Sequence, residues 1–98
     1  MNIIRNQNGT TLEIALEGRL DTTTAPQLEQ ELKACLDGAD ALTLDLTKLD
    51  YISSAGLRVL LSTHKIMSKK GGMKVTNVNE IVQEVFDVTG FSDILTIE

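Results

Sequence analysis

ALTLDLTKLDYISSAGL, residues 41–57, contains the change of period that decides the fold. In residues 41–46 leucine alternates with other residues, which is the two-residue period of a strand with one buried face. From about Ala55 apolar residues recur every three or four positions, which predicts a helix over 55–70. A strand covered on both faces would be apolar throughout, so we expect helices mainly on one face of the sheet.

Outward from this stretch, alternating and helical patterns continue to both ends of the chain. A hairpin is predicted first, because Asn8-Gly9 between two strand-like runs is a strong tight-turn signal. The predicted order β-β-α-β-α-β-α-β gives an α/β fold with a mixed sheet of about five strands in one domain over 1–98. The other predicted elements are strands at 2–7, 11–17, 73–76 and 94–97 and helices at 24–36 and 79–88.

Capping and packing residues are also predicted for the two flanking helices. Thr24 is expected to cap the first helix, with Gln27 three residues further on and Gly38 at its end. Asn79 is expected to cap the third helix. The inward face of the third helix is predicted to consist of Ile81, Val82, Val85 and Phe86.

Composition narrows the classes of function. The formal net charge is -5. The densest basic region, Lys69-Lys70 and Lys74, flanks a glycine turn and is interpreted as solvated, so we expect no direct contact with nucleic acid. One cysteine, Cys35, cannot form an internal disulfide, which fits a reducing compartment. No stretch has the length of a membrane span or of a signal-peptide core. We therefore expect a cytoplasmic protein that does not enter the membrane.

Two loops are candidates for a functional site. One covers Gly18 to Thr24, and the other covers Tyr51 to Leu57. Each follows a predicted strand and leads into a predicted helix. Because sites in such sheets gather at the carboxyl ends of strands, we expect the two loops to be neighbours.

Ser53 and Ser54 stand where the second helix begins, and they allow two interpretations. The first is helix capping, worth about 1 kcal/mol, for which one serine suffices. The second is a phosphorylation site, because free N–H groups and the helix dipole favour a phosphate at this position. Gly56 costs up to about 1 kcal/mol in a helix relative to alanine, but it would let another molecule approach closely.

Asp21 in the other loop likewise allows two interpretations. It can be a turn residue that shares a capping role with Thr22 and Thr23. Alternatively, it can contact a modifying enzyme or the Ser54 hydroxyl. The sequence leaves both interpretations open.

The sequence shows no set of residues that is typical of a catalytic centre. The only histidine, His64, lies ten residues after Ser54 on the same predicted helix, about 15 Å away. A nucleophile and its base must come within about 3 Å, so a Ser-His-Asp triad is excluded. One cysteine and one histidine do not suggest a zinc site, and Cys35 is expected to be inert core. We expect no enzyme, no catalytic residue, no metal and no cofactor.

Taken together, these segments resemble the STAS domains of bacterial anti-sigma factor antagonists over nearly the whole chain. The resemblance lies in the joint order and spacing of several short motifs. They are Gly18-Arg19-Leu20-Asp21, Leu42-Thr43-Leu44-Asp45-Leu46, Leu49-Asp50-Tyr51-Ile52-Ser53-Ser54-Ala55-Gly56-Leu57, Gly71-Gly72 and Val85-Phe86-Asp87-Val88-Thr89-Gly90-Phe91.

The resemblance implies a switch controlled by phosphorylation of Ser54. In that family an anti-sigma factor serine kinase modifies the serine and a phosphatase reverses the reaction. The unphosphorylated antagonist, expected to be a monomer when free, binds the kinase-type anti-sigma factor and frees the sigma factor. The partner-binding residues that the resemblance implies are Asp21, Thr22, Thr23, Ser53, Ser54, Ala55, Gly56 and Arg58.

Three positions depart from the family pattern. Many members have Asp where this chain has Ser53, Ser or Thr where it has Ala55, and Gly where it has Arg58. Ser53 is therefore a secondary candidate for phosphorylation. The departures also leave room for a second hypothesis, a STAS scaffold or ligand-sensing module that binds a nucleotide, a lipid or another regulatory protein without being a kinase substrate. A small hydrolase, the third hypothesis, lacks a base within reach of the serine.

Overall fold

Five strands form one sheet in the spatial order β1-β2-β3-β4-β5. The computed structural model describes residues 1–98. β1 runs antiparallel to β2, and the other neighbouring strands run parallel. This arrangement confirms the predicted mixed sheet and the predicted hairpin. The strands are β1 (Asn2–Asn8), β2 (Thr11–Leu20), β3 (Ala41–Ile52), β4 (Met73–Thr76) and β5 (Thr96–Ile97).

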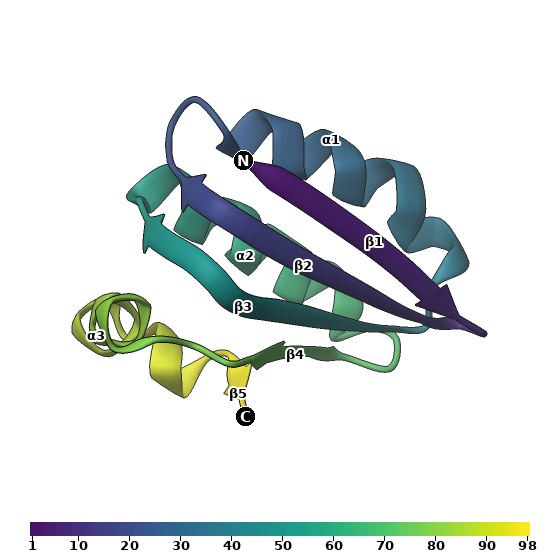
Figure 1. Ribbon diagram of the computed structural model, residues 1–98. Helices are drawn as coiled ribbons and strands as arrows, with labels where there is room; N and C mark the ends of the chain where they lie inside the picture. Colours follow the sequence, from purple (N-terminus) through teal and green to yellow (C-terminus); the bar gives the residue numbers. More distant parts are fainter.

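Three helices connect the parallel strands. They are α1 (Ala25–Cys35), α2 (Ser54–Met67) and α3 (Glu80–Thr89), with 3-10 turns at Leu36–Gly38 and Phe91–Asp93. α1 and α2 lie side by side behind the sheet, whereas α3 lies at one end of the sheet beside β3 (Figure 1). The helices therefore cover mainly one face, as predicted. The longest helix has 14 residues, and none combines the length and apolar character needed to cross a bilayer.

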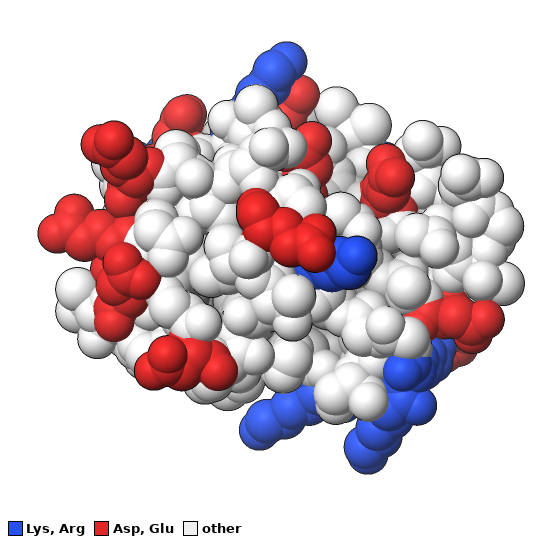
Figure 2. Space-filling model, turned by 90° about the horizontal axis from the view of Figure 1, so that it is seen from below, with Lys and Arg blue, Asp and Glu red and all other residues white.

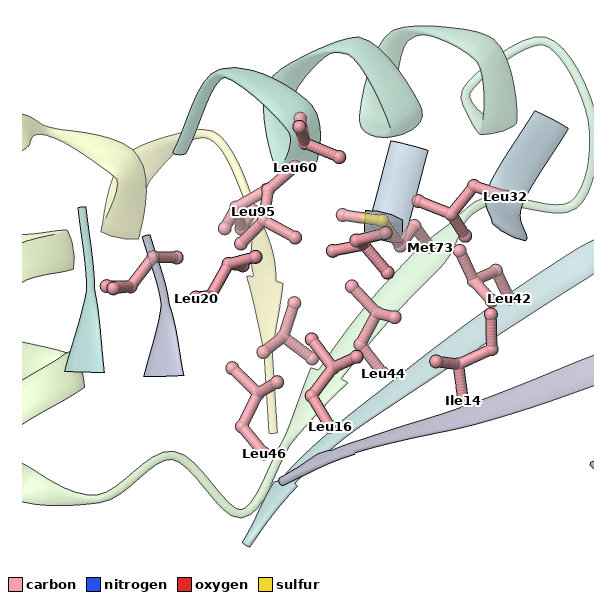
Figure 3. Packing of buried hydrophobic residues seen from close by; sticks show 14 of the residues in the cluster. Ile14, Leu16, Leu20, Leu32, Leu42, Leu44, Leu46, Leu60, Met73 and Leu95 are labelled. Carbon is pink, nitrogen blue, oxygen red and sulfur yellow. The ribbon is translucent and has the colours of Figure 1, made fainter. Parts of the chain in front are cut away.

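The core lies between the sheet and the pair α1 and α2. Alternate residues of β2 and β3 point into it, as Figure 3 shows for Ile14, Leu16, Leu42, Leu44 and Leu46. Each of these side chains is at most 1% exposed. Burying a side chain of this size contributes about 1.5–3 kcal/mol, so a one-residue slip of either strand would be strongly disfavoured.

β3 is longer than the sequence predicts, because it continues six residues past 46 to Ile52. The strict alternation breaks after Leu46, and the next buried residues are Leu49 and Ile52. The pairing of β2 with β3 shifts register in the same region, between Ala15 and Glu17. Such irregularities change which side chains face the core, and this hides the end of the strand from a two-residue pattern.

Three predictions about the flanking helices need correction. Ile81 is 62% exposed, because α3 buries only the narrow stripe of Val82 and Phe86. Thr24 makes no side-chain cap on α1; its hydroxyl accepts from the Asp21 amide and donates to the Arg19 carbonyl, each at 2.8 Å. α1 also ends at Cys35, and Gly38 belongs to the following 3-10 turn.

The predicted cap of α3 is confirmed. The Val82 amide donates to Oδ1 of Asn79 at 2.9 Å. The same side chain donates through Nδ2 to the Leu49 carbonyl at 2.6 Å, so this cap also attaches α3 to β3. Both hydrogen bonds fix the position of α3 at the end of the sheet.

Candidate functional site

The two candidate loops lie next to each other, as the sequence predicts. β2 and β3 are paired up to their last residues, with Arg19 opposite Tyr51 and Leu20 opposite Ile52. Directly beyond this pair, the Ser53 amide donates to the Leu20 carbonyl at 2.9 Å. The loop after β2 and the start of α2 therefore form one surface at the carboxyl ends of the strands.

The two serines at the start of α2 have different surroundings. Ser53 is the N-cap with extended backbone, and its Oγ accepts from the Gly56 amide at 3.5 Å, a long bond. Ser54 is the first residue of the helix and is exposed. Its hydroxyl makes no hydrogen bond within the chain, whereas Ser53 is partly buried. Capping is therefore assigned to Ser53, and the Ser54 hydroxyl is accessible from solvent.

Gly56 is buried, and its lack of a side chain allows close packing inside the protein. A Cβ on Gly56 would lie 2.6 Å from Cγ of Leu20 and 3.0 Å from Cγ1 of Ile52. These distances are too short for carbon atoms, so only glycine lets α2 approach the ends of both strands. This finding corrects the expectation that the glycine admits another molecule, and it leaves Gly56 outside the exposed surface.

Asp21 organises its own loop. Its Oδ1 accepts from the Thr23 hydroxyl at 2.7 Å and from the amides of Thr23 and Thr24 at 3.0 and 3.1 Å. The Thr23 hydroxyl first, and then the two amides, hold the pKa of Asp21 below its ordinary value of 3.8. Asp21 thus has the turn role that the sequence allowed, and no hydrogen bond joins it to Ser54.

Arg19 is a further charged residue of this surface, and no role was predicted for it beyond its place in the Gly18-Arg19-Leu20-Asp21 motif. Its guanidinium lies over the Tyr51 ring, 4.3 Å from the ring centroid. Its Nε is 3.8 Å from Oδ2 of Asp21. The signal in the sequence was indirect, since only the pairing of β2 with β3 brings Arg19 opposite Tyr51.

A hollow of about 260 Å³ opens between the two loops and the helices that follow them. Thr22 contributes from the Asp21 loop, while Ala55 and Arg58 contribute from the first turns of α2. Thr22, Thr23 and Arg58 are exposed, and Ala55 is partly buried. Three of the predicted partner-binding residues, Thr22, Ala55 and Arg58, therefore line one hollow. Asp21, Thr23, Ser53 and Ser54 lie in the same two segments but outside this lining, and Gly56 is buried. The hollow is completed by Ala25, Pro26, Glu29, Val59 and Ser62.

A second hollow, of about 340 Å³, adjoins the first, and together they form a groove between α1 and α2. It shares Glu29, Val59 and Ser62 with the first. Its apolar lining comes from Leu32, Leu36, Val59 and Ile66, and Ile66 is 48% exposed. The spacing of apolar residues in each helix could not reveal this groove, because its shape depends on how the two helices pack.

Charged side chains are unevenly distributed over the surface. On the face shown in Figure 2, acidic side chains are most numerous at the left end but also lie over the centre and right, and basic side chains gather mainly at the lower right. No continuous basic stripe crosses this face.

Lys70, which was predicted to be solvated, makes hydrogen bonds within the chain. Its Nζ donates to the carbonyls of Leu36 and Ala39 at 2.7 and 3.1 Å, which corrects the interpretation of Lys69-Lys70 as a purely solvated turn.

The single histidine and cysteine lie apart from this surface. His64 is partly buried in α2, and its Nδ1 is buried without a hydrogen-bond partner. Cys35 is partly buried, and its Sγ donates to the Glu31 carbonyl at 2.9 Å. No group of three or more His, Cys, Asp or Glu side chains is arranged to hold a metal ion.

Comparison with known proteins agrees with this fold. The family model of the STAS domain matches residues 2–98. The anti-sigma-B factor antagonist of Bacillus subtilis is 32% identical over 98 residues, covering 99% of this chain and 90% of that protein. BtrV of Bordetella bronchiseptica is 42% identical over 84 residues, covering 84% of this chain and 72% of BtrV. The crystal structure of an anti-sigma factor antagonist from Mycobacterium paratuberculosis has a TM-score of 0.88 at 25% identity, with 98% of this chain and 83% of that chain covered.

The chain therefore belongs to the STAS domain family. Within that family, sequence and fold group it with the anti-sigma factor antagonists. These relatives are named for regulating other proteins, which agrees with the resemblance seen in the sequence motifs.

Proposed function

We propose that this chain is an anti-sigma factor antagonist that works by phosphorylation-controlled partner switching and is not an enzyme. The unphosphorylated chain binds an anti-sigma factor with serine kinase activity, in the cytoplasm, and so releases a sigma factor. Phosphorylation of Ser54 blocks this binding, and a phosphatase restores it. The relatives named as anti-sigma factor antagonists support the choice of partner class.

The observation that carries the proposal is the division of roles between Ser53 and Ser54. Ser53 caps α2, so the exposed Ser54 hydroxyl can be modified without loss of the cap. The γ-phosphoryl group of ATP would pass to Oγ of Ser54, with release of ADP and the hydroxyl proton. A phosphate adds about -1.5 to -2 charges, and the free N–H groups of the first helical turn favour it.

The same position explains how modification acts on a docked protein. Ser54 lies on the surface that the Asp21 loop and the first turns of α2 form together. A protein seated on this surface would meet a bulky dianion in place of a hydroxyl group. The switch then needs no refolding of the antagonist, since the phosphate sits outside the core.

Mass spectrometry after incubation with a cognate anti-sigma kinase and ATP tests the site. We expect phosphate on Ser54 in the wild type, in Ser53→Ala and in Ser62→Ala, and none in Ser54→Ala. Ser62 is a matched control because it is also an exposed serine on α2. Phosphate confined to other residues, with Ser54 unmodified, would contradict the proposal.

Binding to the same kinase tests the switch itself. Ser54→Ala is expected to keep the fold and to remain able to bind after incubation with ATP. Ser54→Asp is expected to weaken binding, because a negative charge replaces the hydroxyl group at the interface. Equal affinity of Ser54→Asp and the wild type, measured by calorimetry, would count against a role for charge at this position.

A ligand-sensing module is the second candidate, and the groove between α1 and α2 favours it. The larger hollow, of about 340 Å³, is in the size range of small-molecule sites and has an apolar lining. Calorimetric titration of the chain with nucleotides, without any kinase, tests this candidate. Binding that Val59→Trp abolishes, in a variant that still unfolds cooperatively, would support the module and place the ligand in the groove.

A further inference from the structure

We propose that Arg58 pairs with a phosphate group on Ser54 of the same helix and holds it against the start of α2. The inference rests on the proposed function, because it requires a phosphate at Ser54.

The two residues are one helical turn apart. Ser54 is the first residue of α2, and Arg58 is the fifth. Residues four positions apart lie on the same face of a helix, with about 5–6 Å between their Cβ atoms. Helical side chains lean toward the amino end, so a long side chain at position 58 extends over the turn that begins with Ser54.

Arg58 has no competing partner in the unmodified chain. Its side chain is exposed, and it takes part in none of the five ion pairs of the structure. Glu29 lines the same hollow but pairs with Lys33 at 3.0 Å. Asp21 is also engaged, through the hydrogen bonds of Oδ1 in its own loop and the contact of Oδ2 with Arg19.

The chemistry of the two groups is complementary. A guanidinium offers N–H donors in a planar fork that matches two oxygens of a phosphate. The dianion would also receive N–H groups from the first turn of α2. A glycine at position 58 would leave only those N–H groups, so Arg58 adds a charged donor from the side chain.

Besides holding the phosphate, the pairing would change which charges the surface offers to a docking protein. In the unmodified chain the guanidinium of Arg58 is available to acidic groups of a docking protein. Once the phosphate is present, the guanidinium is occupied within its own helix. Phosphorylation thus adds a dianion to the surface and withdraws a cation from it.

Phosphorus-31 NMR of chain with phosphoserine placed at position 54 during translation tests the pairing without any kinase. The second pKa of the phosphate, ordinarily about 6, is measured by titration in the otherwise wild-type chain, in Arg58→Ala and in Lys69→Ala. Lys69 is the matched control, because it is an exposed lysine outside all ion pairs, in the turn after α2. Both variants remove one positive charge.

We expect Arg58→Ala to raise the proton affinity of the phosphate about two- to threefold, because the neighbouring cation favours the dianion. Lys69→Ala should leave it nearly unchanged, and Arg58→Lys should restore part of the wild-type behaviour. Equal titration of the wild type and Arg58→Ala would overturn the pairing, and so would equal effects of Arg58→Ala and Lys69→Ala. Modification of Ser54 by a kinase is measured in the separate experiment above, so failure of either proposal can be recognised by itself.

Discussion

The side chain of Leu20, at the end of β2, occupies the space beside Gly56 where any other residue would place its Cβ. Leu20 is fully buried, and Gly56 lies in the first turn of α2. This contact joins the last residue of β2 to the helix that presents Ser54. The geometry of the candidate site therefore depends on a packing contact beneath it.

Gly56→Ala is expected to destabilise the chain, although alanine favours helices by about 1 kcal/mol. The new Cβ would meet Leu20 at 2.6 Å, and overpacking of this kind typically costs about 1–3 kcal/mol. Urea unfolding should show a net loss in the free energy of unfolding. Combined with Leu20→Ala, the loss should be smaller than the sum of the two single effects, because the clash is relieved. Additive effects would show that the two residues are not in conflict.

Replacing the two serines one at a time should separate capping from signalling. Ser53→Ala is expected to lower the free energy of unfolding by about 0.5–1 kcal/mol, at the low end for a cap because the bond to Gly56 is long. Ser54→Ala should change it by less than about 0.5 kcal/mol, as for other exposed positions. Thermal or urea unfolding measures both. A larger loss for Ser54→Ala than for Ser53→Ala would reverse the assignment of the cap.

Asp21 should contribute to stability in a pH-dependent way. Its pKa is lowered in the folded chain, so the unfolded chain binds more protons near the ordinary value of 3.8. The contribution is therefore fully present above that value and is lost as the pH falls through the lowered pKa. Asp21→Asn should show a weaker loss of stability on acidification than the wild type.

Unfolding of both chains between pH 3 and pH 7 measures this difference. Asp45 and Asp87 also have lowered pKa values, mainly through hydrogen bonds from Thr47 and Ser92. They are present in both chains, so their effect cancels in the comparison. Parallel stability curves for the wild type and Asp21→Asn would contradict the role assigned to Asp21.

Lys70 should stabilise the end of α1 from a distant part of the chain. Its ammonium group donates to two carbonyls, those of Leu36 and Ala39. Lys70→Met keeps most of the apolar stem and removes both bonds, so we expect a loss of about 0.5–1.5 kcal/mol. Lys69→Met is the matched control and should have little effect. Equal unfolding free energies for the two variants would mean that the Lys70 bonds contribute nothing.

The order of strands and helices could be predicted because most elements show a regular period over at least part of their length. The start of α2 was predicted to within one residue, since Ser53 and Ser54 have the chemistry of a cap beside an apolar run. The adjacency of the two loops was also predictable, because the carboxyl ends of parallel strands lie at one edge of a sheet.

What escaped prediction depends on contacts between distant segments. The register shift that extends β3, the clash that requires glycine at position 56 and the bonds of Lys70 each involve two elements far apart in sequence. The exposure of Ile81 has the same origin. Ile81 fits the apolar pattern of α3, but the residues that α3 buries are only its neighbours Val82 and Phe86. Regular spacing within a single helix carries no information about these contacts.

The two outermost strands differ in length, seven residues in β1 and two in β5. A row of unpaired backbone N–H and C=O groups can recruit a strand from another molecule, and very short edges offer little to recruit with. Lateral growth of this sheet is therefore restricted to the β1 side. On that side, a second copy could add through a symmetric pairing of β1 with β1. The free edges of the resulting pair would be the two-residue β5 strands, so growth would stop at a pair instead of continuing into a fibre.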